Sequence, residues 1–472
     1  MIVTLNDGST LTCDDQPFTE GGEGYLFWEK SGKYVVKLYK PNVTADREAA
    51  LQKIIGPEYS VVLGGDGKIE PYWDELFAWP KSIIVKPLLG LTMPKVKGMD
   101  LMWYLGPKPR RVLAMKEGAE ALGKWTNYLA MAIRMARVVR RMHFRGLCHS
   151  DLSFRNFLAD ARESKIILID CDGLVVPGFL PAGVLGTPKC MAPELMMYIT
   201  SPQKASATPS SQTDLHALST LIYWLLLQRH PLLGPKQNHS DPGMDEALAL
   251  GEKALFIENH KDKSNNFPVL PLPYARMFTP EVQRLVQRAF MDGLDDPSKR
   301  PAAADWERFL TRMTDSVVPC DNPQCPLGAY IVLPGYPATC PACQTPTRTL
   351  STLPLLHMYR PQGGRQGHFM SDRGYLVVGW PDRGLHVWHA MPGQEPGPGI
   401  DHGVKAAIEY DRKKGKWYFA NKDLAEVRML DSVSGHQDIH PGVSVEITDG
   451  VRLMFGPPDQ CRLAYVEMMH VT

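Results

Sequence analysis

The chain has 472 residues, of which 44% are hydrophobic and 22% are charged, the composition of an ordinary globular protein with about two to four domains. Its 52 basic and 51 acidic side chains leave a formal net charge of +1, so charge gives no argument for a nucleic-acid or membrane partner. Residues 1–15 lack the basic and apolar runs of a signal peptide, and the apolar stretch 217–227 is too short to cross a bilayer, so we expect a cytoplasmic protein.

The first ninety residues are predicted to form strands with one helix. Apolar residues recur at helical spacing over 46–55. Four short β-prone runs, two of them separated by a turn at 30–33, predict strands at 25–28, 34–39, 82–85 and 88–93.

The rest of the chain divides into three further segments by composition and predicted secondary structure. Residues 95–315 are mostly helical in pattern, and 316–350 are rich in Pro, Gly and Cys. Strand-like runs return over 351–472. Helices are predicted over 125–143, 214–228, 280–291 and 303–313, and later strands over 374–379, 406–410, 416–420, 443–448, 452–455 and 462–468.

Glycines cluster at Gly21, Gly22 and Gly24, between two predicted strands. Glycine lets backbone N–H groups approach phosphates closely, although such clusters also simply make turns. Lys37 lies inside the next apolar strand, where an unpaired ammonium group would be costly to bury. Glu48, on the following predicted helix, is the expected partner, which would leave Lys37 to hold phosphates.

A dense group of polar residues follows the helix predicted over 125–143. Asp151 and Asn156 stand five residues apart, and Asp170 ends an apolar run 14 residues after Asn156. In phosphoryl transfer a base must orient the attacking hydroxyl, and oxygen ligands must hold Mg²⁺ against the phosphates. The residue types and spacing suit that reaction.

These segments, in this order, resemble the signature set of the protein kinases. The resemblance extends to residues 186–194, ending in Ala-Pro-Glu, and to residues 295–301, whose Arg300 is expected to pair with Glu194. Asp214 matches the aspartate that braces the catalytic loop in that family. The resemblance covers roughly residues 15 to 315 and implies an α+β, two-lobed protein-kinase-like fold.

The resemblance also implies a role for each matching residue. Gly21, Gly22 and Gly24 would cover the phosphates of ATP, and Lys37, paired with Glu48, would hold the α- and β-phosphates. Adenine would meet a hinge over 93–96. The remaining roles fall to Met93 and Lys95 at that hinge, to Asp151 as the catalytic base, and to Asn156 and Asp170 as ligands of Mg²⁺.

Several residues depart from the family pattern. Ser153 stands where serine/threonine kinases place a lysine, and Arg155 stands where tyrosine kinases place an arginine that could supply the missing charge. Asp170 is followed by Cys-Asp in place of Phe-Gly, which leaves Asp172 as a second candidate metal ligand. Ser150 replaces the arginine that pairs with a phosphorylated activation loop, so activation by that route is not expected.

Cys320, Cys325, Cys340 and Cys343 form two pairs of cysteines. This spacing is typical of a zinc ribbon, in which four thiolates hold a structural Zn²⁺, and the alternatives are unrelated cysteines or two disulfides. An odd total of nine cysteines favours a reducing compartment. Residues 320–343 contain no Lys or Arg, which argues against nucleic-acid binding and for a protein-contact or spacer role.

The last 120 residues predict a β-sandwich, and their order of motifs is similar to a forkhead-associated domain. Such domains commonly bind phosphothreonine. Trp380 stands where that family has its arginine, and residues 401–406 do not clearly carry its Ser-x-x-His motif. The sequence thus predicts four domains: kinase N-lobe 1–94, kinase C-lobe 95–315, zinc ribbon 316–350 and a forkhead-associated-like sandwich 351–472.

Kinase core, ribbon and sandwich together resemble bacterial eukaryotic-like protein kinases associated with tellurite resistance and stress. The resemblance implies two partners besides a protein substrate, namely a metal-dependent protein phosphatase and a von Willebrand A-domain protein. The expected activity is ATP- and Mg²⁺-dependent transfer to Ser/Thr hydroxyls of a protein, the chain itself included. The alternatives are a nucleotide-binding pseudokinase scaffold and a small-molecule kinase, which the Ala-Pro-Glu segment and Arg300 disfavour.

Overall fold

The computed structural model describes residues 1–472 apart from 42–44, 57–60, 66–67, 176–185, 201–207, 348–349, 366, 398, 432–434 and 472. The described chain divides into two compact units. The first consists of Met1–Val269 and Leu285–Glu307, and the second of Leu270–Arg284 and Arg308–Thr472. Each unit is described separately below.

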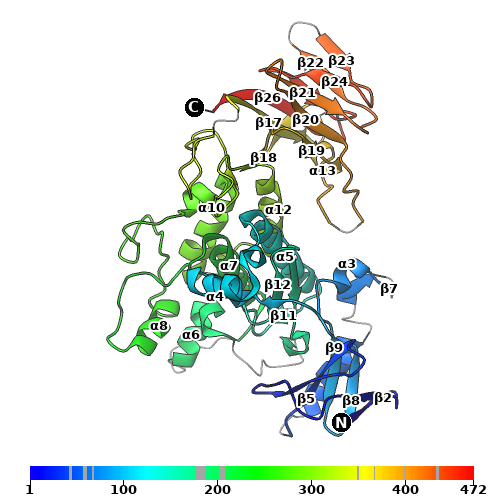
Figure 1. Ribbon diagram of the computed structural model, residues 1–472, viewed down its shortest axis with the longest axis vertical. Helices are drawn as coiled ribbons and strands as arrows, with labels where there is room; N and C mark the ends of the chain where they lie inside the picture. The colour runs from blue at the N-terminus through cyan, green and yellow to red at the C-terminus, as the bar shows by residue number, and fades with distance from the viewer. Residues whose placement is uncertain are drawn as a thin grey trace. The chain divides into compact units, whose positions relative to one another are not determined.

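The first unit begins with a seven-stranded antiparallel sheet in the order β2-β1-β8-β9-β5-β4-β3. Four of its strands, β2, β5, β8 and β9, are labelled in Figure 1. All four strands predicted in this region are present, as β4, β5, β8 and β9. The β1–β2 hairpin was not predicted. The strand bounds are β1 (Ile2–Leu5), β2 (Thr10–Thr12), β3 (Thr19–Glu20), β4 (Gly24–Trp28), β5 (Tyr34–Tyr39), β8 (Ser82–Lys86) and β9 (Gly90–Pro94).

The predicted helix over 46–55 is α1 (Ala45–Ile55). Its apolar face buries Ala50, Leu51 and Ile54 completely, as expected for an amphipathic helix that packs on a sheet. The indole Nε1 of Trp79 donates to the carbonyl oxygen of Ile54 at 3.1 Å, which fixes the end of the helix. A small connection follows, formed by β6 (Gly64–Gly65), β7 (Lys68–Ile69) and α3 (Pro71–Asp74).

A helical region follows the sheet. Helix α7 is hydrophobic on nearly all sides and therefore lies in the interior. Helix α5 packs against it, and the indole of Trp125 donates to the carbonyl of Leu226 at 3.2 Å (Figure 1). The other helices wholly within the first unit are α4 (Pro107–Glu117), α5 (Trp125–Phe144), α6 (Pro193–Thr200), α7 (Ser211–Leu227), α8 (Pro242–Leu250) and α11 (Gly293–Asp295). Helices α10 (Pro280–Gln287) and α12 (Ala303–Thr314) have residues in both units, and α9 (Tyr274–Met277) belongs to the second unit.

Short strands flank several loops of the helical region. They form a three-stranded sheet in the order β10-β12-β13 and a separate pair of β11 with β14. Their bounds are β10 (Met99–Asp100), β11 (Cys148–His149), β12 (Phe157–Asp160), β13 (Lys165–Leu168) and β14 (Leu174–Val175).

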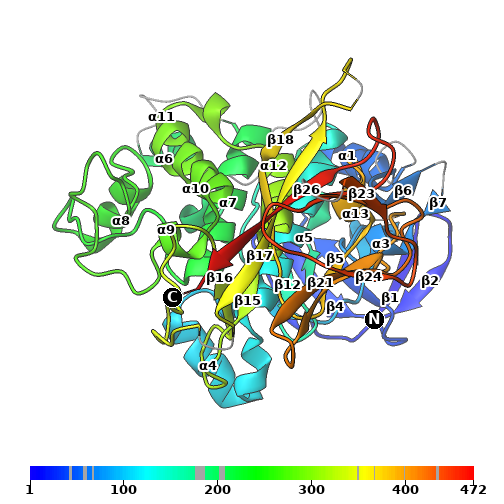
Figure 2. The ribbon, with the colours of Figure 1, turned by 90° about the horizontal axis from the view of Figure 1, so that it is seen from above.

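The second unit contains the cysteine-rich segment and two antiparallel sheets. The sheets have the orders β18-β17-β26-β25-β22-β23 and β19-β20-β21-β24, and β17 runs between β18 and β26 in Figure 2. The elements are β15 (Val317–Pro319), β16 (Ala329–Ile331), β17 (Thr352–Pro361), β18 (Phe369–Val378), β19 (Arg383–Leu385), α13 (Val387–Ala390), β20 (Ala406–Asp411), β21 (Lys416–Asn421), β22 (Arg428–Asp431), β23 (Gly435–Asp438), β24 (Ser444–Glu446), β25 (Arg452–Met454) and β26 (Leu463–His470).

Residues 270–284 belong to this second unit although the sequence placed them within the helical domain 95–315. The reason lies in their hydrogen bonds. Arg276 donates to the carbonyl oxygens of Pro337 and Thr339 at 3.0 Å each. The hydroxyl of Tyr336 in turn donates to the carbonyl of Phe278 at 2.7 Å. The pattern of apolar residues predicts helices well but does not report such polar contacts.

Candidate active site

A short hairpin brings Asn156 and Asp170 together. Strands β12 and β13 pair with Phe157 opposite Leu168, and the backbone N–H of Ile169 donates to the carbonyl of Asn156 at 2.9 Å. Asn156 precedes one strand and Asp170 follows the other. The 14-residue spacing in the sequence therefore closes into one end of a hairpin.

Asp151 lies beside this hairpin end. Its carbonyl oxygen accepts a hydrogen bond from the Asn156 amide at 2.7 Å. Its carboxylate accepts from Thr187 twice, from the backbone N–H at 2.7 Å and from the hydroxyl at 3.2 Å. The Asp151 carboxylate is thus positioned to accept a hydrogen bond from an aliphatic hydroxyl.

The two pairings expected around this loop are present. Asp214, whose side chain is buried, accepts from the backbone N–H of His149 at 2.9 Å and lies 3.0 Å from Nε2 of His143. Arg300 binds both carboxylate oxygens of Glu194 at 2.8 Å. A bidentate arginine–carboxylate pair of this kind fixes two chain segments relative to each other.

The two aspartates after β13 differ in surroundings. The Asp170 side chain is 41% exposed, has a left-handed backbone with φ of 59°, and lies 2.9 Å from the ammonium group of Lys37. The Asp172 side chain is only 1% exposed and accepts from Lys37 at 2.8 Å, from the Tyr39 hydroxyl and from Arg47 at 3.4 Å. Asp170 therefore remains accessible to a metal ion, whereas Asp172 is enclosed by cations and a hydroxyl.

Asn156 completes a donor set that suits Mg²⁺. Its amide nitrogen is used by Asp151, and within the described residues no donor reaches its amide oxygen. An amide oxygen and a carboxylate are ligands that Mg²⁺ prefers. The residues present therefore fit a magnesium ion, which Asn156 and Asp170 would hold.

The charged groups of this cluster shift one another's pKa values. Partial desolvation raises the pKa of Asp170, and the charge of the neighbouring Asp172 raises it further. Burial alone would raise the pKa of Asp172, but the charges of Lys37 and Arg47 hold it well below its usual range. Burial would lower the pKa of Lys37, yet the two aspartates keep it above the usual value, so Lys37 is a permanent cation.

The expected pair of Lys37 with Glu48 is not formed. Glu48 is exposed, and its hydrogen-bonding partner is Gln52 one turn along α1. The position before it, Arg47, points inward to Glu23 and Asp172. Because neighbouring residues of a helix lie about 100° apart around its axis, Arg47 and Glu48 cannot both face the cluster.

Asp172 pairs with Lys37 in the place expected for Glu48. Tyr39 and Arg47 complete its surroundings, and sequence reasoning missed both. The available signal was the pair of acids in Asp-Cys-Asp, since a second buried carboxylate requires additional donors.

The three glycines have different environments. A Cβ on Gly24 would lie 2.4 Å from the carbonyl oxygen of Leu38, so this glycine is required by strand packing. Gly21 and Gly22 are exposed, and a Cβ on Gly22 would meet open space. The role of all three near phosphates stays a prediction.

Met93, Lys95, Ser153 and Arg155 were also singled out in the sequence, and their surroundings are as follows. Met93 is buried at the end of β9, and the ammonium of Lys95 lies over the Trp28 ring at 4.3 Å from its centroid. Arg155 is exposed, and Ser153 is fully buried with its hydroxyl accepting from the Arg155 N–H at 3.3 Å. The hinge role and the charge-supplying role remain predictions.

The four clustered cysteines converge. Their sulfur atoms all lie within 4.8 Å of one another, with Cys320 3.6 Å from Cys343 and Cys325 3.5 Å from Cys340. A disulfide has sulfur atoms about 2.05 Å apart, whereas tetrahedral zinc with bonds of about 2.3 Å separates its sulfurs by about 3.8 Å. The residues fit a closed, structural zinc site. The five other cysteines are buried.

Among the described helices, none is both long and apolar enough to cross a membrane.

Comparisons with known proteins point to kinases. A family model described as the lipopolysaccharide kinase (Kdo/WaaP) family matches residues 120–173, the segment that carries Asp151, Asn156 and Asp170. The chain is similar to a dual serine/threonine and tyrosine protein kinase of Apis mellifera, with 27% identity over 184 residues, which are 39% of this chain and 16% of that protein. It thus spans only a small part of that relative's length. The chain is kinase-like.

Among solved structures, the kinase domain of a specific rhoptry antigen of Toxoplasma gondii aligns with 67% of this chain and 86% of its own. The identity is 12% and the TM-score is 0.41.

Proposed function

We propose that this chain is an ATP- and Mg²⁺-dependent protein kinase that transfers the γ-phosphate to Ser or Thr hydroxyls of a protein substrate, the chain itself included. One observation carries the proposal. The carboxylate of Asp151 accepts a hydrogen bond from the Thr187 hydroxyl, beside the hairpin end that holds Asn156 and Asp170. A base that orients a hydroxyl next to metal ligands is the arrangement that phosphoryl transfer requires.

Each group has a task in this mechanism. Asp151 orients the acceptor hydroxyl and takes its proton, and Lys37, a permanent cation, binds phosphate oxygens. Asn156 and Asp170 would hold Mg²⁺, which would supply positive charge against the phosphates. Asp172 holds Lys37 and Arg47 in place. Arg155 is exposed near the loop and is the proposed source of the charge that Ser153 lacks.

A second candidate is a sugar kinase. The match of residues 120–173 to a lipopolysaccharide kinase family favours it, and a sugar hydroxyl meets the same requirement at Asp151. The bidentate pair of Arg300 with Glu194 supports the protein kinase, because it completes two further motifs of that family. A pseudokinase scaffold remains the alternative without catalysis.

The second unit has proposed roles of its own. The four-cysteine cluster would be a zinc ribbon stabilised by its ion, and the two sheets of residues 351–472 would form a forkhead-associated-like sandwich. The combination supports membership among bacterial kinases associated with tellurite resistance and stress. A metal-dependent phosphatase and a von Willebrand A-domain protein are the partners we propose on that basis.

Identifying the acceptor tests the proposal. Purified protein is incubated with γ-labelled ATP and Mg²⁺, with a protein acceptor pool in one arm and deacylated lipopolysaccharide in the other. Labelled sites are then mapped by mass spectrometry. Label on Ser or Thr residues supports the protein kinase. Label confined to the sugar would replace it with the second candidate, and nucleotide binding without any transfer would indicate the scaffold.

A further inference from the structure

The second unit contains a pocket of about 230 Å³ whose lining includes five arginines. These are Arg308 and Arg312 of α12, Arg360 of β17, Arg373 of β18 and Arg462 just before β26. The acids in the same lining are Asp372 and Glu395, which leaves a formal surplus of three positive charges. Like charges gather in this way at sites that bind anions.

Two of the arginines, Arg312 and Arg462, are held in the pocket lining by hydrogen bonds to Asp372. The buried Asp372 carboxylate accepts from Nε of Arg462 at 2.8 Å and from a terminal nitrogen of Arg312 at 3.2 Å. Arg312 also donates to the Asp372 carbonyl at 3.1 Å, and Arg462 to the Met391 carbonyl at 3.2 Å. This network fixes both guanidinium groups in the lining of the pocket.

Two other arginines are uncommitted. Within the described residues, the side chains of Arg360 and Arg373 make no hydrogen bond or ion pair. Arg373 has a left-handed backbone with φ of 54°, a conformation that L-residues with a side chain rarely adopt. Strain of this kind persists at functional positions.

A bulge produces that conformation. In the pairing of β17 with β18, Leu376 lies opposite His357 and Ser371 opposite Tyr359, so four residues of β18 face one residue of β17. Bulges re-aim side chains next to binding sites. Here the bulge contains both Asp372 and Arg373, which line the pocket.

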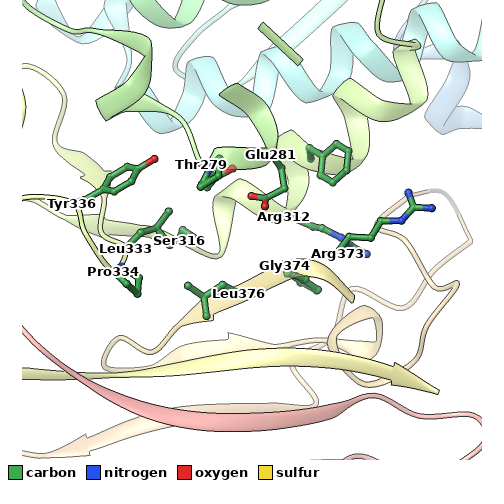
Figure 3. A pocket seen from close by; sticks show the side chains of 13 residues that line it. Thr279, Glu281, Arg312, Ser316, Leu333, Pro334, Tyr336, Arg373, Gly374 and Leu376 are labelled. Carbon is green, nitrogen blue, oxygen red and sulfur yellow. The ribbon is translucent and has the colours of Figure 1, made fainter. Parts of the chain in front are cut away.

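An apolar pocket of about 150 Å³ adjoins the first and shares Arg312 and Arg373 with it. Figure 3 shows these two arginines toward one side of the pocket and Leu333, Pro334 and Tyr336 toward the other. A ligand that enters from the cationic side therefore meets an apolar surface next to its charge.

We propose that the arginine pocket binds a phosphate monoester whose carrier places an apolar group in the adjoining pocket. Guanidinium groups match phosphate oxygens in geometry and charge, and several converging arginines distinguish a dianion from a carboxylate. The site belongs to the second unit, and its lining contains neither the cluster around Asp151 nor Trp380. It therefore does not depend on the proposed kinase activity.

The test uses the full-length chain without ATP. The probes are inorganic phosphate, phenyl phosphate, AMP and a fluorescent degenerate peptide pool with a central phosphothreonine, beside its unphosphorylated counterpart. Direct binding is measured for the peptides and competition for the others. The double variant Arg360→Ala/Arg373→Gly removes the uncommitted charges, and glycine at 373 relieves the backbone strain. Arg365→Ala/Arg412→Ala, at two exposed positions, is the charge-matched control.

We expect phenyl phosphate to bind more tightly than inorganic phosphate, and the double variant to lose about tenfold or more in affinity while the control variant does not. Preference for the phosphopeptides over AMP would identify a protein-borne phosphate, and the reverse preference a small molecule. The proposal is overturned if no phosphorylated probe binds, if the double variant binds as well as the control, or if phenyl phosphate gains nothing over inorganic phosphate.

Discussion

Asp170 and Asp172 lie two residues apart, and their side chains meet different surroundings. Asp170 is partly exposed beside Lys37, whereas Asp172 is buried among Lys37, Tyr39 and Arg47. A buried carboxylate with three donors serves to position its neighbours, and an accessible one can bind a metal. We therefore propose Asp170 as the ligand of Mg²⁺, a choice that the sequence had left open.

Exchanging each aspartate for asparagine should separate these roles. Asp170→Asn should lower kcat by about 10²- to 10³-fold and raise the Mg²⁺ requirement, because a metal ligand is weakened. Asp172→Asn should instead lower the free energy of unfolding by about 3 kcal/mol, because Lys37 and Arg47 lose a buried partner. Mg²⁺ titrations of activity and denaturant unfolding measure the two effects, with exposed Asp14→Asn as control. An equal rise in Mg²⁺ requirement for both variants would contradict the assignment.

Substitutions of Gly24 and Gly22 should separate a role in strand packing from a role in nucleotide binding. Gly24→Ala should destabilise the protein by about 1–3 kcal/mol, because its Cβ would lie 2.4 Å from the Leu38 carbonyl. Gly22→Ala meets open space and should change stability by less than about 0.5 kcal/mol. If the loop covers phosphates, Gly22→Ala raises the KM for ATP severalfold. An unchanged KM would show that this glycine only makes a turn.

At the scale of elements, periodicity predicted α1, α5 and α7 closely, because each buries an apolar face or is apolar throughout. Periodicity did not predict strands whose pairing partners are distant in the chain or whose polar–apolar alternation is interrupted. The β1–β2 hairpin depends on pairing with β8, some eighty residues away. Strand β18 was predicted from residue 374, but it begins at Phe369, because the polar bulge interrupts its alternation.

In the loop that carries Asp151, too, local contacts could be predicted from the sequence and distant ones could not. The spacing of Asn156 and Asp170 predicted that they would lie together, and the β12–β13 hairpin joins them, while their roles stay predictions. The partners of Asp172 could not be predicted from the sequence, because Tyr39 and Arg47 come from a strand and a helix far earlier in the chain. Contacts between distant elements are set by packing, which one sequence does not display.

A buried histidine joins two elements near the active site and should make stability depend on pH. His230, after the end of α7, lies 2.8 Å from the Lys189 carbonyl through Nε2 and accepts from the Leu232 N–H through Nδ1. Burial lowers the pKa of His230 to about 4. An unfolded histidine binds a proton near pH 6.5, so the free energy of unfolding should fall as pH drops from about 6.5 toward 4.

His230 alone should cost about 2 kcal/mol between pH 7 and pH 5. Denaturant unfolding at several pH values measures the loss, and His230→Gln should reduce the slope, because glutamine does not titrate. The exposed His436→Gln is the control and should leave the slope unchanged. A wild-type slope that His230→Gln does not alter would contradict the assignment.

At the scale of the whole molecule, the chain combines a kinase-like unit with a second unit that holds the cysteine cluster and both C-terminal sheets. The second unit should depend on zinc. We expect one zinc ion per chain, and its removal by a strong chelator, or Cys325→Ser, should cost several kcal/mol. Hydrogen exchange should increase over 317–345, while the exposed loop variant Lys413→Ala changes nothing. Full stability without zinc would exclude a structural metal.

The most direct test of the account is phosphotransfer by the wild-type protein beside Asp151→Asn, a near-isosteric change that retains the contacts of the loop backbone. Both proteins are incubated with γ-labelled ATP and Mg²⁺, and ATP binding is measured in parallel. We expect the wild type to transfer label and the variant to lose about 10³-fold or more of this activity, with ATP affinity nearly unchanged. Equal transfer by both proteins would contradict the role of Asp151, and ATP binding without transfer by either would contradict the kinase itself.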